Sequence, residues 1–237
     1  MLKLGLPSKG RLMDQCFDWF GARGLPLSRS GSDREYAAVA AADEVEPVLL
    51  SAAEIPRELA AGRIHLGVTG SDLVQDRLAD WRGQVVELAP LGFGQADLVL
   101  AVPAAWVDVE TLDDLDAVAA AFRAAHGMRL RIATKYHRLV RDFLRAHEVA
   151  DYQLVDSQGA TEGTIRNLTA EAIADITSSG ETLRANHLRI LSDGLILESQ
   201  ATLYAARSAD WSPGAQAAFR ALAPRLGVIG HPWAHPV

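Results

Sequence analysis

The segment DITSSGET, residues 175–182, places a carboxylate and several hydroxyl side chains directly behind the apolar run AIA. Asp175 lies at the carboxyl end of a predicted strand, where α/β folds bind their ligands. The hydroxyls come from Thr177, Ser178, Ser179 and Thr182. With Gly180, which lets the backbone approach closely, and the N–H groups of a following helix, they suit a phosphate. The acid suits a pair of sugar hydroxyls, so the pattern indicates a phosphorylated ribose.

The same segment also fits an ordinary turn between a strand and a helix. Ser179 would then cap the helix, with Thr182 in its first turn, because serine at a helix start accepts a backbone N–H. Short polar loops of this kind are common in α/β folds. From this segment alone, both interpretations stay open.

A second polar turn follows the first predicted strand, in LGLPSKGRL, residues 4–12. Lys9 and Arg11 flank Gly10 where a helix begins. Cations are unfavourable at a helix start unless an anion is present, so the turn favours an anion such as pyrophosphate. The alternative is two solvated basic side chains.

Two weaker candidates are also strand-to-helix turns. GVTGSDLV contains Gly70, Ser71 and Asp72, although the helix dipole also explains an acid in the first turn. Lys135 follows a strand in KYHR, where His137 fits a helix surface better than a general base.

Other kinds of chemistry find little support. Arg34 precedes a strand in SDRE and on its own is a surface arginine. Neither GxxxxGK[ST] nor a GxGxxG that opens a helix is present. The histidines lack metal-ligand spacing, so no protein metal site is expected. Cys16 lies in the amphipathic run MDQCFDWF, which indicates a buried structural thiol.

Composition narrows the class of protein. The 237 residues carry a formal net charge of −7 without a clustered basic face, which argues against a nucleic-acid partner. A single cysteine excludes an internal disulfide and fits the cytoplasm. The start MLKLGLPSKG lacks a signal peptide's apolar region, and no apolar stretch reaches the roughly 18–20 residues that span a bilayer. We therefore expect a cytoplasmic protein without a membrane association.

Strands and helices alternate almost throughout, which predicts an α/β fold with mostly parallel sheets. The expected strands are 2–6, 35–41, 45–52, 64–70, 85–91, 97–103, 129–134, 152–156, 171–177, 188–191 and 195–206. The expected helices are 9–24, 54–62, 71–79, 111–127, 135–147, 163–169, 179–186 and 213–225, with Ser71 and Thr111 as N-caps.

The middle block has its own βαβαβ order, and the two ends share alanine-rich strands. We therefore predict two lobes, with the second inserted into the first. Lobe I would comprise residues 1–94 plus 187–237, and lobe II, residues 95–186, would carry the 175–182 loop. A cleft between such lobes is a usual place for a ligand.

Five segments, in order, resemble the ATP phosphoribosyltransferase family: LGLPSKGRL, EIPRELAAGRIHLGVTGSDLV, LGFGQADLVLAV, RIATKYHRLVRDFL and EAIADITSSGETL. DITSSGETL is the most specific of them. The resemblance implies a two-lobed fold of the periplasmic-binding-protein type (type II) and the first reaction of histidine biosynthesis. In that reaction N1 of the ATP adenine attacks ribose C1 of phosphoribosyl pyrophosphate, and pyrophosphate leaves. A non-catalytic small-anion-binding protein of the same fold is the alternative.

The resemblance also implies roles for individual residues. The catalytic charges, facing pyrophosphate or the nucleotide, would be Lys9, Arg11 and Arg34. The phosphoribosyl site would comprise Asp175 toward the ribose hydroxyls and Thr177, Ser178, Ser179, Gly180, Glu181 and Thr182. The nucleotide would contact Gly70, Ser71, Asp72 and Lys135. The expected cofactor is Mg²⁺, which would bridge pyrophosphate oxygens with few protein ligands.

By resemblance, the chain is the short, catalytic form of the enzyme. It would act as a homodimer within a hetero-oligomer that includes a histidyl-tRNA-synthetase-like regulatory subunit. Roughly 30 residues follow the last predicted strand, too few for a sensing domain. Two positions depart from the family pattern. Ser51 stands where many relatives have arginine, with Arg57 nearby, and SQGATEGTIRNL leaves the role of Glu162 open.

Overall fold

The computed structural model describes residues 1–30, 37–40, 42–157, 160–228 and 232–233, and its contacts divide the chain into two units. Unit 1 comprises Met1–Gly94 and Gln200–Val237, and unit 2 comprises Gln95–Ser199. The second unit is therefore inserted into the first, and each is built around its own mixed sheet.

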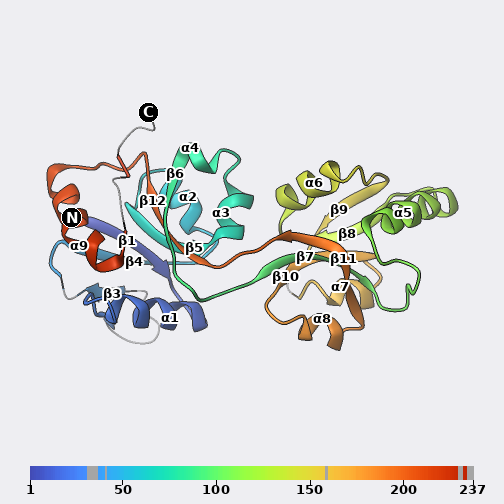
Figure 1. The fold of residues 1–237 in the computed structure, drawn as a ribbon, viewed down its shortest axis with the longest axis horizontal. Coiled ribbons are helices and arrows are strands. Elements are labelled where there is room, and N and C mark those ends of the chain that lie inside the picture. The colour runs from blue at the N-terminus through green and yellow to red at the C-terminus, as the bar shows by residue number, and fades with distance from the viewer. Residues whose placement is uncertain (31–36, 41, 158–159, 229–231, 234–237) are drawn as a thin grey trace. The chain divides into compact units, whose positions relative to one another are not determined.

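The sheet of unit 1 has the order β2-β3-β4-β1-β5-β12-β6. Its strands are β1 (Leu2–Pro7), β2 (Leu27–Ser30), β3 (Ala37–Ala40), β4 (Val45–Leu50), β5 (Leu66–Gly70), β6 (Val85–Pro90) and β12 (Ala201–Ala206). Its helices are α1 (Gly10–Gly21), α2 (Ile55–Ala60), α3 (Ser71–Arg77), α4 (Trp81–Gln84) and α9 (Pro213–Leu226). Helices α1 and α9 cover one face of the sheet, and α2 and α3 cover the other (Figure 1).

The core under α1 and α9 follows from the alternation of apolar residues in β1. Leu2, Leu4 and Leu6 are fully buried on one face, where they pack with Cys16 of α1 and Phe219 of α9. Burial raises the pKa of the Cys16 thiol to about 12, because the thiolate would be desolvated. The expectation of a buried structural thiol is thus confirmed, and a nucleophilic role is disfavoured.

The sheet of unit 2 has the order β11-β7-β10-β8-β9. Its strands are β7 (Asp97–Pro103), β8 (Leu130–Thr134), β9 (Tyr152–Asp156), β10 (Ala172–Thr177) and β11 (Leu188–Leu197). Its helices are α5 (Leu112–His126), α6 (His137–Ala146), α7 (Gly163–Arg166) and α8 (Glu181–Ala185). Figure 1 shows α5 and α6 on one face of this sheet and α7 and α8 on the other.

Both sheets are mixed rather than purely parallel, because each contains a strand that runs against its neighbours. In unit 1, β12 is antiparallel to both β5 and β6. In unit 2, β7 is antiparallel to both β10 and β11. Both are the strands by which the chain enters a unit from the other. Parallel neighbours need a crossover connection within one unit, and an entering strand has none. At the edge of the sheet of unit 1, β3 is also antiparallel to both of its neighbours, β2 and β4.

The boundary expected between residues 186 and 187 also needs correction. Residues 187–199 belong to unit 2, because β11 pairs with β7 along most of its length. The expected strand 195–206 is two elements, since β11 ends at Leu197 and β12 begins at Ala201. The other boundary, after Gly94, falls where it was predicted.

Most other predicted elements are present within a few residues of their expected ends, while β2 and α4 were not predicted. Thr111 caps α5 through a capping box with Asp114, as expected. Ser71 does not cap α3, because Gly70 occupies the cap position and Ser71 is the first helical residue. In the described part of the chain, no helix combines the length and apolar character needed to cross a membrane.

Candidate active site

The 175–182 loop begins at the end of a strand that is held on both sides. β10 pairs with β7 and β8, and its residues Ala172, Ile173 and Ala174 are fully buried. Asp175 follows, partly buried, and accepts a hydrogen bond from the N–H of Ile176 at 2.9 Å. A strand fixed in this way gives the loop a rigid base.

The loop lines a cavity of about 260 Å³ in unit 2. Its polar lining from the loop consists of Asp175, Thr177, Ser178, Ser179 and Thr182, all of which were predicted as site residues. Gly180 and Glu181 were predicted too, but they do not line the cavity. Glu162, whose role the sequence left open, does line it, together with Gln95, which was not predicted.

Hydrogen bonds within the loop hold it in shape. Thr177 Oγ1 accepts from the N–H of Gly180 at 2.8 Å, and Ser179 Oγ accepts from the N–H of Glu181 at 3.3 Å. The Gly180 amide is therefore engaged by the protein itself. Among the described residues, none of the loop's four hydroxyls donates to a protein acceptor. Their O–H groups are available to an anion.

The interpretation of Ser179 as an ordinary helix cap does not describe this turn. The cap position of α8 is Gly180, which has a left-handed backbone with φ of 71° and no side-chain cap. Arg184, one helical turn later, donates from Nη2 to the carbonyl oxygen of Ser179 at 3.0 Å. Arg184 thus stabilises the loop without lining the cavity. No sequence motif predicted this role. Helix α8 has only 5 residues, so its dipole adds little to the electrostatics of this loop.

A second polar cavity, of about 360 Å³, lies in unit 1 beside the first strand-to-helix turn. Lys9 lines it with Ser8, Ser51 and Glu54. Lys9 is exposed and stands at the cap position of α1 without a side-chain cap. The Ser51 N–H donates to Glu54 Oε2 at 3.0 Å, and hydrogen bonds from the Ser51 side chain and backbone lower the pKa of Glu54.

Not every predicted basic residue belongs to this second cavity. Arg11 is exposed on α1 but does not line it. Arg57, the nearby cation considered as a replacement at Ser51, is exposed on α2 and also lies outside the lining. Arg34 lies outside the described residues.

A family model described as HisG, ATP phosphoribosyltransferase, matches residues 51–227 of the chain. The chain belongs to the ATP phosphoribosyltransferase family. An ATP phosphoribosyltransferase of Cereibacter sphaeroides is 73% identical over 228 residues, which cover 96% of each protein. Another, of Rhodopseudomonas palustris strain BisB18, is 50% identical over 224 residues, which cover 94% of this chain and 69% of that relative.

Solved structures show the same fold. The ATP phosphoribosyl transferase (HisG:HisZ) complex from Thermotoga maritima matches with a TM-score of 0.69 at 19% identity, over 96% of this chain and 97% of that one. An ABC-transporter choline-binding protein matches with a TM-score of 0.52 at 12% identity, over 90% and 73% of the two chains. The predicted periplasmic-binding-protein type of fold is confirmed.

Membership in the ATP phosphoribosyltransferase family decides between the two functional interpretations. The catalytic one is confirmed, and the chain is a transferase of histidine biosynthesis. The alternative, a non-catalytic anion-binding protein, is not supported, because the similarity to named transferases covers nearly the whole chain.

The residues assigned to the nucleotide in this transferase come from both units. Gly70, Ser71 and Asp72 open α3 in unit 1, and Lys135 is an exposed residue after β8 in unit 2. Asp72 is only 5% exposed, and a Cβ added to Gly70 would collide with its Oδ1. The Asp72 carboxylate is therefore packed into the start of its own helix, which matches the structural interpretation of this acid.

Proposed function

We propose that the transferase moves the phosphoribosyl group of phosphoribosyl pyrophosphate to N1 of the ATP adenine, and that the 175–182 loop holds the ribose 5-phosphate. The supporting observation is a cavity whose wall combines four hydroxyl groups with two partly buried carboxylates, those of Asp175 and Glu162. Ser178 and Thr182 would donate to phosphate oxygens, and Asp175 would accept from the ribose hydroxyls. The hydrogen bond from Arg184 to the Ser179 carbonyl oxygen would hold the backbone at Ser179 in position.

The reaction is a displacement at ribose C1. A bond forms between adenine N1 and C1, while the bond from C1 to the pyrophosphate oxygen breaks and its electron pair leaves with pyrophosphate. The transition state has oxocarbenium character, so alignment of the reactants and stabilisation of the departing charge matter more than a nucleophilic side chain. We propose that Lys9 and Arg11 stabilise pyrophosphate and that Arg34 adds positive charge.

Magnesium is proposed as the cofactor. Among the described residues, no cluster of three or more histidine, cysteine, aspartate or glutamate side chains could hold a metal ion. We propose an ion carried mainly by substrate oxygens and water, because Mg²⁺ usually keeps several waters and takes few protein ligands. Glu162 and Asp175 are carboxylates in the wall of the loop cavity and suit Mg²⁺ as hard oxygen donors. When bound, the ion would neutralise charge on pyrophosphate.

A regulatory subunit is part of the proposal. The similar structure from Thermotoga maritima is described as a HisG:HisZ complex, which supports a hetero-oligomer for this chain as well. We propose a histidyl-tRNA-synthetase-like partner and a homodimer of this chain within the assembly. A cytoplasmic location stays a prediction that rests on the single cysteine.

The test of the reaction is pyrophosphate release with ATP and phosphoribosyl pyrophosphate, with and without the partner subunit. Pyrophosphate should form only when both substrates are present, together with an equal amount of N1-phosphoribosyl-ATP detected by mass spectrometry. Release that needs only one substrate, or no release in the complete assembly, would contradict the proposal.

A further inference from the structure

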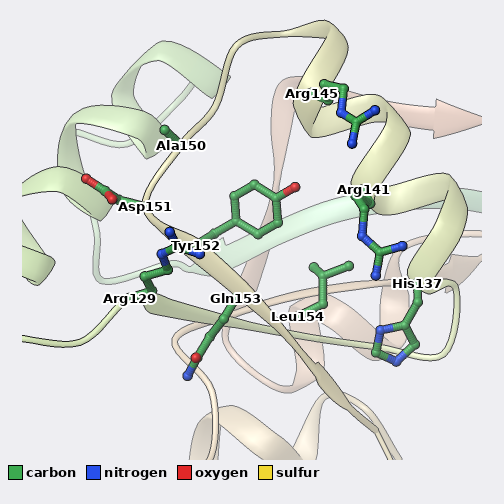
Figure 2. Close-up of a pocket in the computed structure, with 9 residues that line it drawn as sticks. All are labelled: Arg129, His137, Arg141, Arg145, Ala150, Asp151, Tyr152, Gln153 and Leu154. Atoms are coloured by element: carbon green, nitrogen blue, oxygen red, sulfur yellow. The ribbon is translucent and has the colours of Figure 1, made fainter.

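A cavity of about 480 Å³ in unit 2 is lined mainly by basic and polar side chains of α6 and β9 and belongs to no site described above (Figure 2). Three of its lining residues are arginines: Arg129, Arg141 and Arg145. It shares no lining residue with the loop cavity. Its concentration of positive charge stands out in a chain whose formal net charge is −7.

The helix contributes a continuous basic stripe. His137, Arg141 and Arg145 are four residues apart along α6, so they lie on one face of the helix. All three line the cavity. In Figure 2 the hydroxyl of Tyr152 points toward this stripe, and the Tyr152 ring lies between the stripe and Arg129. Cationic groups and a phenol therefore face a common space from two sides.

The three guanidinium groups have no ion-pair partner among the described residues. Arg141 and Arg145 are also like charges four residues apart, a spacing that destabilises a helix by itself. The acids close to them are already engaged. Asp151 pairs with Arg123, and Asp156 Oδ1 lies 2.6 Å from His137 Nε2.

On another face of α6, an arginine does have an acidic partner. Arg138 pairs with Asp142, with Nη1 and Oδ2 3.7 Å apart, at the same four-residue spacing. Neither residue lines the cavity. Asp142, the acid of α6, therefore pairs with Arg138 and not with Arg141 or Arg145.

We propose that this cavity binds the phosphate chain of a nucleotide or of an inorganic polyphosphate. Guanidinium groups donate two parallel hydrogen bonds to phosphate oxygens, and the Tyr152 hydroxyl can donate a further one. The size of the cavity falls within the range of small-molecule sites. A stable protein partner would instead need about 800 Å² of surface from each side, far more than one concave patch of nine residues offers.

This site is separate from the 175–182 loop. Strands β8, β9 and β10 run parallel. The loop follows the carboxyl end of β10, whereas Arg129 precedes β8 and Asp151 precedes β9. The part of the basic cavity formed by Arg129 and Asp151 therefore lies at the amino ends of these strands, and because the two cavities share no lining residue, a ligand in one does not occupy the other.

The experiment measures binding and location together. Inorganic tripolyphosphate and cytidine triphosphate are titrated into the complete chain by calorimetry, and hydrogen–deuterium exchange locates each probe. Both probes should protect peptides from residues 137–156. The double variant Arg141→Gln/Arg145→Gln should raise Kd more than tenfold. The matched control is Arg138→Gln, on the same helix but outside the cavity, which should change Kd less than threefold.

The outcomes separate the two sources of the phosphate chain. Equal affinity for both probes would assign the site to the phosphate chain alone. Tighter binding of cytidine triphosphate, lost in Tyr152→Leu, would assign it to a nucleotide whose base stacks on the ring. Protection confined to peptides from 177–185, affinity unchanged in the double variant, or no protection at about 5 mM of either probe would overturn the proposal. Melting temperatures of all variants check that each is folded.

Discussion

Replacing Gly180 with alanine tests whether the shape of the 175–182 loop matters for phosphoribosyl pyrophosphate binding. Gly180 has φ of 71°, a left-handed conformation that costs an L-residue about 1–2 kcal/mol. A Cβ at this position would lie 3.2 Å from Nη1 of Arg184 and 3.8 Å from Cδ1 of Ile190. The contact with Ile190 is ordinary, so the steric demand falls on the side chain that braces Ser179.

The effect on binding follows from what Gly180 holds in place. Its N–H bonds Thr177 Oγ1 at 2.8 Å, and Arg184 must keep its bond to the Ser179 carbonyl oxygen while making room. A chain that relaxes the strain by changing φ would move both hydroxyl-bearing residues. We expect calorimetry to show phosphoribosyl pyrophosphate binding weakened at least tenfold, which is about 1.4 kcal/mol. The melting temperature should fall by about 2–8 °C.

Gly127→Ala is the matched control. Gly127 ends α5 in the same left-handed conformation, with φ of 69°, and a Cβ there meets no atom within 4 Å. The control should lose similar stability and bind phosphoribosyl pyrophosphate normally. If Gly180→Ala binds as tightly as this control while losing as much stability, the loop's conformation does not serve the ligand and the reasoning is refuted.

Three further predictions concern charge, burial and regulation. Lys9→Ala and Arg11→Ala should each slow pyrophosphate release, by a loss of about 2–4 kcal/mol of transition-state stabilisation, with little change in melting temperature. Normal turnover with a lower melting temperature would show that these residues are structural. Because burial raises the pKa of Cys16 from 9.0 to about 12, the unfolded thiol ionises first, so the free energy of unfolding should fall as pH rises above 9. A Cys16→Ala variant with the same pH dependence over that window would contradict this. Initial rates against histidine concentration should show inhibition of the assembly with its regulatory subunit and none of the isolated chain; inhibition of the isolated chain at the same concentrations would place a histidine site within it.

Sequence patterns predicted the elements of this fold better than their pairing. The apolar alternation in residues 2–6 and the capping box at Thr111 are local signals, and both elements form as predicted. Strand direction depends on where the chain comes from. No local pattern shows that β12 lies between β5 and β6. The residues on both sides of 198–200 are apolar, so the sequence predicted one strand where the structure has two.

The candidate site shows the same division. The hydroxyls of the 175–182 loop could be predicted because they are consecutive and follow a buried strand. Glu162 and Gln95 reach the same cavity from distant parts of the sequence, and only the folded sheet brings them there. Arg184 could have been found from its four-residue distance to Gly180, had the left-handed turn been known.

The place of β12 in the sheet sets an order for folding during synthesis. β12 occupies an interior position in unit 1, yet it is made only after all of unit 2. Unit 2 already has both of its ends joined, since the Ala96 N–H bonds the Ser199 carbonyl oxygen at 2.9 Å. It can therefore close while β5 and β6 still lack the strand that separates them. Leu203 of β12 and Phe219 of α9 are the last parts of the larger core of unit 1 to be synthesised. The packing of β1 and α1 is therefore complete only after β12 and α9 have been made. A ribosome-bound chain halted before Gln200 would contain a folded unit 2. Its unit 1 would lack β12 and α9, and the apolar residues that these elements cover would be accessible to chaperones.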